Sequence, residues 1–172
     1  MGKQGSAPSL PTIGWREWIT LPQLGVAAIK AKVDTGARSS SLHAFDLKYI
    51  RPRGKPFVAF KIHPFQNDIR ETIDAEAELV EYRRVRSSSG HVTLRPVIVT
   101  EVQLLEKRFL VELTLASRDT MGFRMLLGRG ALRNRFLVDV GRSMAGGIPD
   151  AVQLKKRRHA RRIRRRRDGD RP

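Results

Sequence analysis

Apolar and polar residues alternate along most of the chain with the two-residue period of a β-strand. In residues 57–62, for example, Val58, Phe60 and Ile62 share one face. The same pattern, or a short apolar run, predicts further strands over residues 15–21, 26–33, 39–44, 78–85, 107–115, 123–127 and 136–140. Because each strand offers an apolar face, we expect the strands to surround one core.

Turn-forming residues separate these runs. Residues 51–56 carry two prolines and a glycine, and residues 63–75 are polar and irregular, so both predict loops. Ser87-Ser88-Ser89-Gly90 is a turn sequence inside residues 79–102, which we predict to form one long hairpin. Residues 131–135 are predicted as one or two helical turns. Together these features favour an all-β barrel or sandwich with one short C-terminal helix.

Length and composition fit one domain with tails. The chain has 172 residues and no cysteine, which excludes disulfides, thiol catalysis and cysteine-ligated metals. No run approaches the roughly 20 apolar residues of a membrane span, and residues 1–12 lack the apolar core of a signal peptide. We therefore expect a cytoplasmic protein that does not contact membranes. We predict a disordered segment over residues 1–11, a domain over residues 12–142, and a linker and disordered basic tail over residues 143–172.

The net charge of +17 is concentrated near the C-terminus, where residues 155–167 hold two lysines and eight arginines and no acidic residue. Such a segment binds phosphates through counterion release, with little sequence specificity. A solubilising tail, a tether to RNA or the ribosome, and a contact with another anionic partner all remain open. The candidate nucleic-acid-binding residues are Lys155, Lys156, Arg157, Arg158, Arg161, Arg162 and Arg164.

The sequence Lys32-Val33-Asp34-Thr35-Gly36-Ala37 carries the strongest chemical signal. An aspartate at the end of an apolar strand, followed by Thr-Gly and a small residue, is how an aspartic protease presents its catalytic carboxylate. That chemistry needs two carboxylates sharing one proton, and the chain has one good copy, so we expect a homodimer. Asp34 is then the acid, Thr35 holds the paired loop, and Gly36 lets the loops approach closely.

Two alternatives remain open for this signal. Asp-Thr-Gly is also an ordinary turn sequence. In addition, Leu137-Val138-Asp139-Val140-Gly141 is a faint second copy, which would supply an internal second carboxylate or would simply end a strand.

The order of several motifs resembles the retropepsin-like aspartic proteases. More narrowly, the chain resembles a bacterial subfamily labelled ATP-dependent zinc proteases and associated with ATP-grasp glutamate ligases. The resemblance covers about residues 12–141. The motifs that carry it are Ile13-Gly14-Trp15-Arg16-Glu17-Trp18, Leu21-Pro22, residues 31–38, Ser87-Ser88-Ser89-Gly90, Arg95-Pro96-Val97 and Leu126-Leu127-Gly128-Arg129.

This resemblance implies a retropepsin-like acid-protease barrel, a homodimeric endopeptidase, and a flap that has Ser88, Ser89 and Gly90 at its tip. A member of the subfamily is associated with trimming glutamate tails from a ribosomal protein, which makes such tails a candidate substrate. The zinc and ATP of the subfamily label have no support in the sequence. It has four histidines without a His-Glu-Xaa-Xaa-His helix and no glycine-rich phosphate loop, so we expect no cofactor and no metal.

The chain departs from retroviral enzymes directly after Ala37. Retroviral sequences continue with acidic residues that pair with a later arginine, whereas here Arg38 follows, so Arg129 lacks that partner. We expect Ala37, Arg38, His43 and Arg95 to bind substrate, together with the flap tip. The three basic side chains, and Arg118, would favour an acidic peptide. The alternative is that they are solvated surface residues.

Two functions are consistent with the sequence. The first is an aspartic endopeptidase that activates water between two Asp34 carboxyls, with acidic or glutamate-modified protein tails as candidate substrates. The second is a non-catalytic retropepsin-fold module that binds RNA or the ribosome through its basic tail.

Overall fold

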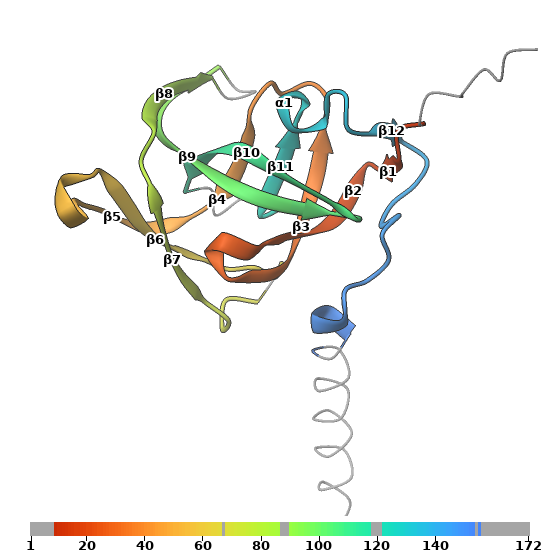
Figure 1. The fold of residues 1–172 in the computed structure, drawn as a ribbon, viewed down its shortest axis with the longest axis horizontal. Helices are drawn as coiled ribbons and strands as arrows, with labels where there is room; N and C mark the ends of the chain where they lie inside the picture. Colours follow the sequence, from red (N-terminus) through yellow and green to blue (C-terminus); the bar gives the residue numbers. More distant parts are fainter. Residues whose placement is uncertain (1–8, 67, 87–89, 118–121, 154, 156–172) are drawn as a thin grey trace, which may run out of the picture.

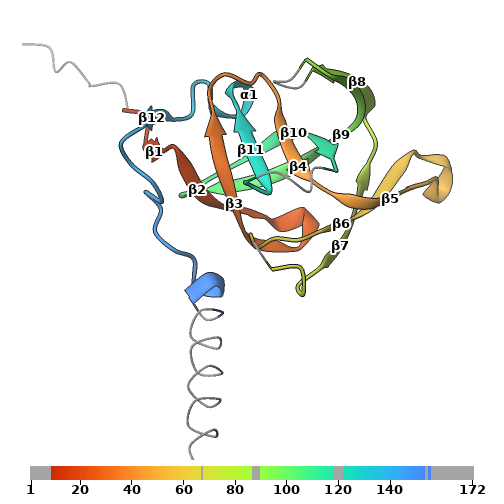
Figure 2. The ribbon, with the colours of Figure 1, turned by 180° about the vertical axis from the view of Figure 1, so that it is seen from behind.

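A computed structural model describes residues 9–66, 68–86, 90–117, 122–153 and 155. Strands dominate this part of the chain, with short helical segments between them (Figures 1 and 2). The elements are β1 (Thr12–Gly14), β2 (Arg16–Leu21), η1 (Pro22–Leu24), β3 (Val26–Asp34), β4 (Ser40–His43), β5 (Phe45–Ile50), η2 (Pro52–Gly54), β6 (Phe57–Ile62), β7 (Ile73–Glu78), β8 (Glu81–Arg86), β9 (Val92–Leu104), β10 (Lys107–Ala116), β11 (Met125–Gly128), α1 (Arg129–Leu132) and β12 (Leu137–Asp139).

The main sheet closes on itself. Its seven strands follow the order β10-β4-β11-β3-β2-β9-β8, and β10 also pairs with β9. Six strands therefore form a closed ring, and β8 extends beyond it as the outer strand of a hairpin with β9. Closure leaves the six barrel strands without a free edge. The all-β barrel predicted from the sequence is confirmed.

The hydrophobic core, to which the barrel and strand β6 both contribute, comes from the alternating apolar positions. Val58, Phe60 and Ile62 of β6 are buried, as their spacing predicts, and so are Val111, Leu113 and Leu115 of β10. In β3, Ile29, Ala31 and Val33 are buried as well. The core therefore reaches the residue that precedes Asp34, which fixes the end of that strand by packing.

A second sheet of three strands, β5-β6-β7, lies beside the barrel. The sequence predicted only its middle strand as a full strand. Residues 73–75, predicted as irregular, are the first half of β7, because the small apolar face of Ile73, Ala75 and Ala77 is a weak signal. Strand β5 was missed because its pairing with β6 shifts register after Phe45, and Asp46 has a φ of 54°.

Glu17 joins the two ends of the domain. Its side chain is 1% exposed, and its carboxylate accepts hydrogen bonds from the backbone amides of Gly14 (2.6 Å), Ala145 (2.9 Å) and Gly146 (3.4 Å). Strands β1 and β12 also pair in parallel. Residues 143–146, predicted as part of a linker, therefore contact the folded domain.

Residues after this segment also pack on the domain. Residues 150–153 and 155 are helical, and Val152 is buried. Within the described ranges, no helix is long and apolar enough to cross a bilayer.

Candidate active site

Asp34 ends the central barrel strand β3. This strand pairs with β2 on one side and in parallel with β11 on the other, where Asp34 lies opposite Gly128. Two parallel strands therefore end side by side, and the loops that follow them meet. The segment after β11 is α1, which begins at Arg129 rather than at the predicted residue 131.

The Asp34 carboxylate is held by its own turn. Its Oδ1 accepts hydrogen bonds from the backbone amides of Gly36 and Ala37, both at 3.1 Å. Its Oδ2 accepts no hydrogen bond from any residue that the structure describes. The half-buried side chain is thus fixed through one oxygen and presents the other.

Arg129 holds the turn from the opposite side. Its Nη1 donates to the carbonyl oxygens of Thr35 (2.8 Å) and Gly36 (3.0 Å). The backbone amides of Arg129 and Gly130 donate to the carbonyls of Ala37 (2.9 Å) and Arg38 (3.1 Å). Arg129 therefore compensates for the acidic partner missing after Ala37 by binding backbone carbonyls.

Gly128 allows the two loops to approach this closely. A Cβ at this position would lie 2.6 Å from the carbonyl oxygen of Ser39 and 3.0 Å from that of Ala37. The Gly128 amide also donates to Oγ of the buried Ser40 at 3.0 Å. Only glycine fits here without displacement of the backbone that carries Asp34.

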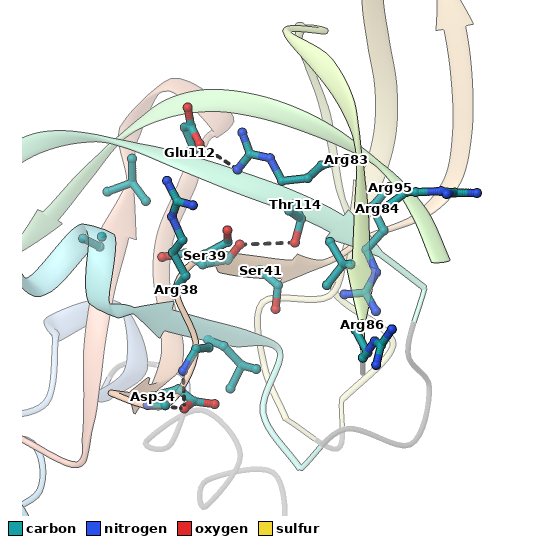
Figure 3. A pocket seen from close by; sticks show the side chains of 18 of the residues that line it. Asp34, Arg38, Ser39, Ser41, Arg83, Arg84, Arg86, Arg95, Glu112 and Thr114 are labelled. Atoms are coloured by element: carbon teal, nitrogen blue, oxygen red, sulfur yellow. Dashed lines mark hydrogen bonds and ion pairs between the residues drawn. The ribbon is translucent and has the colours of Figure 1, made fainter. Parts of the chain in front are cut away.

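Asp34 lies at a cleft of about 1160 Å³ (Figure 3). The wall above it is the flap hairpin, which we define as β8 with its paired part of β9, Val92–Val97. The lining consists of Asp34, residues 36–41, residues 83–86 of β8, Arg95 of β9, residues 110–112 and 114 of β10, and residues 126, 130 and 131.

Arginine dominates the charge of the cleft. Arg38 follows the Asp34 turn, Arg83, Arg84 and Arg86 lie on β8, and Arg95 lies on β9 (Figure 3). The acidic side chains among the lining residues are Asp34 and Glu112, and Glu112 binds Arg83 at 2.8 Å. The cleft therefore favours an anionic ligand through long-range attraction.

Comparison with known proteins identifies this arrangement. A profile described as RimB-like, retropepsin-like aspartic endopeptidase RimB, matches residues 12–146. The chain belongs to the RimB-like family. The matched region contains the Asp34 turn, the flap hairpin and the Gly128 approach.

The curated relatives are longer than this RimB-like chain. A protein of Shewanella halifaxensis named "Probable alpha-L-glutamate ligase" is 43% identical over 144 residues, which are 84% of this chain and 31% of that protein. A protein of the same name from Parasynechococcus marenigrum is 46% identical over 127 residues, which are 74% and 27% of the two chains. The chain thus spans about 31% of the first of these relatives and 27% of the second.

One solved structure shares the RimB-like fold. It is a protein of unknown function, Lpg0085 (DUF785), from Legionella pneumophila, with a TM-score of 0.68 and 27% sequence identity. The match covers 80% of this chain and 98% of the other.

The structure brings most described site candidates of the RimB-like domain together. Asp34, Gly36, Ala37, Arg38 and Arg95 all line the cleft. Arg95 is 7% exposed and donates through Nε to Thr93 Oγ1 at 2.9 Å. Thr35 is exposed beside the cleft lining. Gly90 has a φ of +84° near the end of the flap hairpin, as a tight turn requires. Ser88, Ser89 and Arg118 lie outside the described residues.

His43 was predicted to face the substrate, and the structure contradicts this. Its side chain is 3% exposed, its ring stacks on Phe45 at a centroid distance of 6.3 Å, and it does not line the cleft. All four residues of β4 are buried, and the strand reaches the cleft through Ser40 and Ser41 at its start, whereas His43 lies at its other end.

Asp139 does not supply an internal second carboxylate to this cleft. It ends β12, which pairs with β1 in a separate two-stranded sheet, and it is not among the cleft residues. Its carboxylate accepts from the Gly141 amide at 2.9 Å and pairs with Arg142 at 3.1 Å.

Four charged cleft residues were not predicted from the sequence: Arg83, Arg84, Arg86 and Glu112. A signal was available, because Tyr82-Arg83-Arg84-Val85-Arg86 lies in the predicted flap hairpin and is unusually basic. The predicted substrate-binding residues of the flap were those of its tip, and its strands were not included. Glu112 has no sequence signal, since its place depends on the pairing of β10 with β9.

Lys155 is the one described member of the predicted nucleic-acid-binding set. Its Nζ lies 3.0 Å from Asp68, 2.8 Å from Glu71 and 3.7 Å from the centre of the Phe65 ring. The hydrogen bond from Lys155 is the main cause that holds the pKa of Asp68 well below its usual range. Lys155 thus contacts the domain, while Lys156, Arg157, Arg158, Arg161, Arg162 and Arg164 lie outside the described residues.

Within the described part of the chain, no three histidine, aspartate or glutamate side chains form a group suited to holding a metal ion. The expectation of a metal-free and cofactor-free site stays a prediction.

Proposed function

We propose that this RimB-like protein is an aspartic endopeptidase that works as a homodimer, with Asp34 of each chain facing Asp34 of the other. The observation that carries the proposal is the Asp34 carboxylate. Two backbone amides hold Oδ1, and Oδ2 has no hydrogen-bond partner among the described residues. An aspartic dyad requires a fixed carboxylate with one oxygen left for water and for the second carboxyl group.

In the proposed dimer the two carboxyl groups share one proton, because like charges about 3 Å apart cannot both ionise. The ionised carboxylate accepts a proton from water, and the water oxygen attacks the peptide carbonyl carbon. The protonated carboxyl group donates its proton to the carbonyl oxygen. The tetrahedral intermediate then breaks its C–N bond as a proton passes to the leaving amine.

The room around Gly36 is consistent with a second chain. Among the described residues, a Cβ at Gly36 would meet within 4 Å only Asp34 Oδ1, at 3.3 Å. That contact with the carboxylate is tight, and the rest of the space around Gly36 is open in the part of the chain that the structure describes. In the proposed dimer, the Asp34 turn of the second chain approaches on this side.

We further propose an acidic substrate, such as a glutamate-rich protein tail. Five of the described arginines line the cleft, and guanidinium groups bind carboxylates with charge-assisted hydrogen bonds. The relatives named "Probable alpha-L-glutamate ligase" handle glutamate according to that name, and the chain covers only about a third of their length. We propose that the feature this chain shares with those proteins is the glutamate polymer rather than the ligase reaction.

A subunit-mixing experiment tests the shared-proton mechanism directly. Wild-type chains are mixed with an equal amount of Asp34→Asn chains, allowed to exchange subunits, and assayed on a glutamate-tailed peptide. If a dimer needs two Asp34 residues, activity per wild-type chain falls to about half, since about a quarter of the dimers stay intact.

Asp139→Asn chains are the matched control in the same mixture, because Asp139 lies outside the cleft. Because these chains are expected to be active themselves, the activity per wild-type chain should about double, and the activity per total chain should stay unchanged. An unchanged activity per wild-type chain in the Asp34→Asn mixture, despite verified exchange, would contradict the dimeric mechanism.

The alternative function, an RNA- or ribosome-binding module, is favoured by the ten cations in residues 155–167. Deleting residues 156–172 keeps Lys155 in place. If peptide cleavage survives and RNA retention is lost, the tail directs an enzyme to its target. If the full-length protein cleaves no acidic peptide but binds RNA, the module function is correct.

A further inference from the structure

The flap hairpin is tied to the barrel by an ion pair inside the cleft. Arg83 of β8 donates through Nη1 to Glu112 of β10 at 2.8 Å (Figure 3). Both residues line the cleft. Among the described residues, strand β8 pairs only with β9, so this contact connects the outermost strand to a barrel strand that is not its neighbour.

Arg83 also binds Glu81 on its own strand. Its Nε donates to Glu81 Oε1 at 2.7 Å, and Nη2 contacts the same oxygen. These two carboxylates raise the pKa of Arg83, with Glu112 as the larger cause. One guanidinium with two carboxylates has a local charge of −1, so this part of the cleft does not attract an acidic side chain.

We infer that Glu112 is a specificity-determining residue that occupies Arg83 in place of an acidic substrate side chain and leaves when such a substrate binds. This inference rests on the proposed function. Glu112 is suited to the exchange because its side chain is 53% exposed, and exposed ion pairs are weak. Glu81 stays bound and keeps the guanidinium oriented while Glu112 is replaced.

Because Glu112 competes for Arg83, the cleft selects peptides by the number of negative charges that they carry. Arg38, Arg84 and Arg86 attract any anionic peptide, whereas Arg83 binds only a carboxylate that displaces Glu112. A single acidic residue contacts the open arginines first. A run of acidic residues places a further carboxylate near Arg83, where local concentration favours displacement.

Steady-state kinetics on full-length chains test this inference. Two peptides are used, one with a run of four glutamates and one of equal length with four glutamines, and the readout is the ratio of their KM values (Glu over Gln). Glu112→Gln should lower this ratio about two- to fivefold, because the side chain at position 112 that occupies Arg83 loses its charge. Glu101→Gln removes one charge outside the cleft, where Glu101 faces Arg108 at 3.8 Å, and should leave the ratio unchanged.

A double mutant separates displacement from simple repulsion. In an Arg83→Gln background, Glu112→Gln should lower the KM ratio clearly less than it does in the wild type, because the occupied guanidinium is gone. An equal effect in both backgrounds would overturn the inference, and so would a raised or unchanged ratio in Glu112→Gln alone.

A binding measurement keeps this inference separate from the proposed hydrolysis. In the Asp34→Asn protein, the Nε–H resonance of Arg83, assigned by its loss in Arg83→Lys, is followed by NMR during addition of tetraglutamate. A shift that saturates at lower peptide concentration after Glu112→Gln supports the inference even if no peptide is ever cleaved. An Arg83 signal that never responds overturns it even if cleavage occurs.

Discussion

Two turns of the same sequence type lie at the ends of two strands in this protein. Asp34-Thr35-Gly36 follows β3, and Asp139-Val140-Gly141 follows β12. In both turns the aspartate Oδ1 accepts the amide of the glycine two residues later, at 3.1 Å and 2.9 Å. In both, a Cβ on that glycine would meet the aspartate Oδ1, at 3.3 Å and 3.2 Å.

The surroundings of the two turns differ. The Asp34 turn lies at a cleft, its carbonyls are held by Arg129, and the close approach of Gly128 fixes its position. The Asp139 turn belongs to a two-stranded sheet, and its carboxylate pairs with the exposed Arg142. The tripeptide forms a turn in either place. The surrounding contacts, made by Arg129 and Gly128, distinguish the candidate site from the other turn.

The largest expected difference between the turns is in catalysis. Asp34→Asn should lower kcat for a glutamate-tailed peptide by about 10²–10⁴-fold, since the amide cannot take the proton from water. Asp139→Asn should keep kcat close to that of the wild type. Circular dichroism and sedimentation on both variants control for folding and association. Equal losses of kcat in the two variants would show that the surroundings of the two turns do not distinguish them in catalysis.

The next difference concerns stability. It compares the glycine that lies against the first turn with the glycine inside the second turn. Gly128→Ala should lower the free energy of unfolding by about 1–3 kcal/mol, because its Cβ would overlap backbone atoms of Ser39. Gly141→Ala has room apart from the Asp139 carboxylate and should stay within about 0.5 kcal/mol of the wild type. Urea denaturation measures both. A tolerated Gly128→Ala would refute the close-approach argument.

Loss of the hydrogen bonds from Arg129 to the Asp34 turn should have a smaller effect. Arg129→Gln removes two hydrogen bonds to the Asp34 turn and should lower unfolding free energy by about 1 kcal/mol. Because the turn is then less well positioned, kcat should also fall, by about tenfold. Arg142→Gln, which removes only an exposed ion pair, is the matched control and should change neither quantity measurably. Arg129→Lys should not restore kcat, since it cannot bind two carbonyls with one planar group.

A third aspartate, Asp68, also accepts the backbone amide two residues later, although its segment Asp68-Ile69-Arg70 has no glycine. Asp68 Oδ1 accepts the Arg70 amide at 3.0 Å, and Lys155 lies 3.0 Å from the carboxylate. Lys155 lowers the pKa of Asp68, so its stabilisation is present above the unfolded pKa of about 3.9 and is lost as pH falls through the lowered folded value.

Lys155→Gln should therefore lower Tm only slightly at pH 7, by about 2 °C or less. The difference from wild type should shrink as the pH is lowered from about 4, and thermal melts from pH 7 to pH 2 measure it. A gap in Tm that is equally large at pH 2 would mean that Lys155 acts through its packing on Phe65 rather than through its charge.

The sequence was sufficient for the parts of the fold that depend on local pattern. Alternation located β3, β6 and β10, and Asp34 was placed correctly at a strand end. The family resemblance supplied the order of the Asp34 turn, the flap hairpin and Gly128. Residues of the turn and of the hairpin line one cleft, and Gly128 packs against the backbone of residues 37 and 39 beside it.

The remaining features depend on pairings that no local pattern encodes. His43 is buried because both faces of β4 are covered, which a short strand does not reveal. Arg129 binds carbonyls of residues 35 and 36, more than 90 positions away, so its sequence neighbourhood gives no hint. Glu112 faces Arg83 only because β9 pairs with both β8 and β10.

The Glu17 contacts have a consequence for protein architecture. Because one carboxylate binds the amides of Gly14 and Ala145, the two ends of the family-matched region, residues 12–146, lie at the same corner. A domain with adjoining ends can be grafted into or onto a larger polypeptide through a single attachment point. It should equally tolerate circular permutation, with its natural ends joined by a short linker and new ends opened in the exposed turn at Arg53-Gly54.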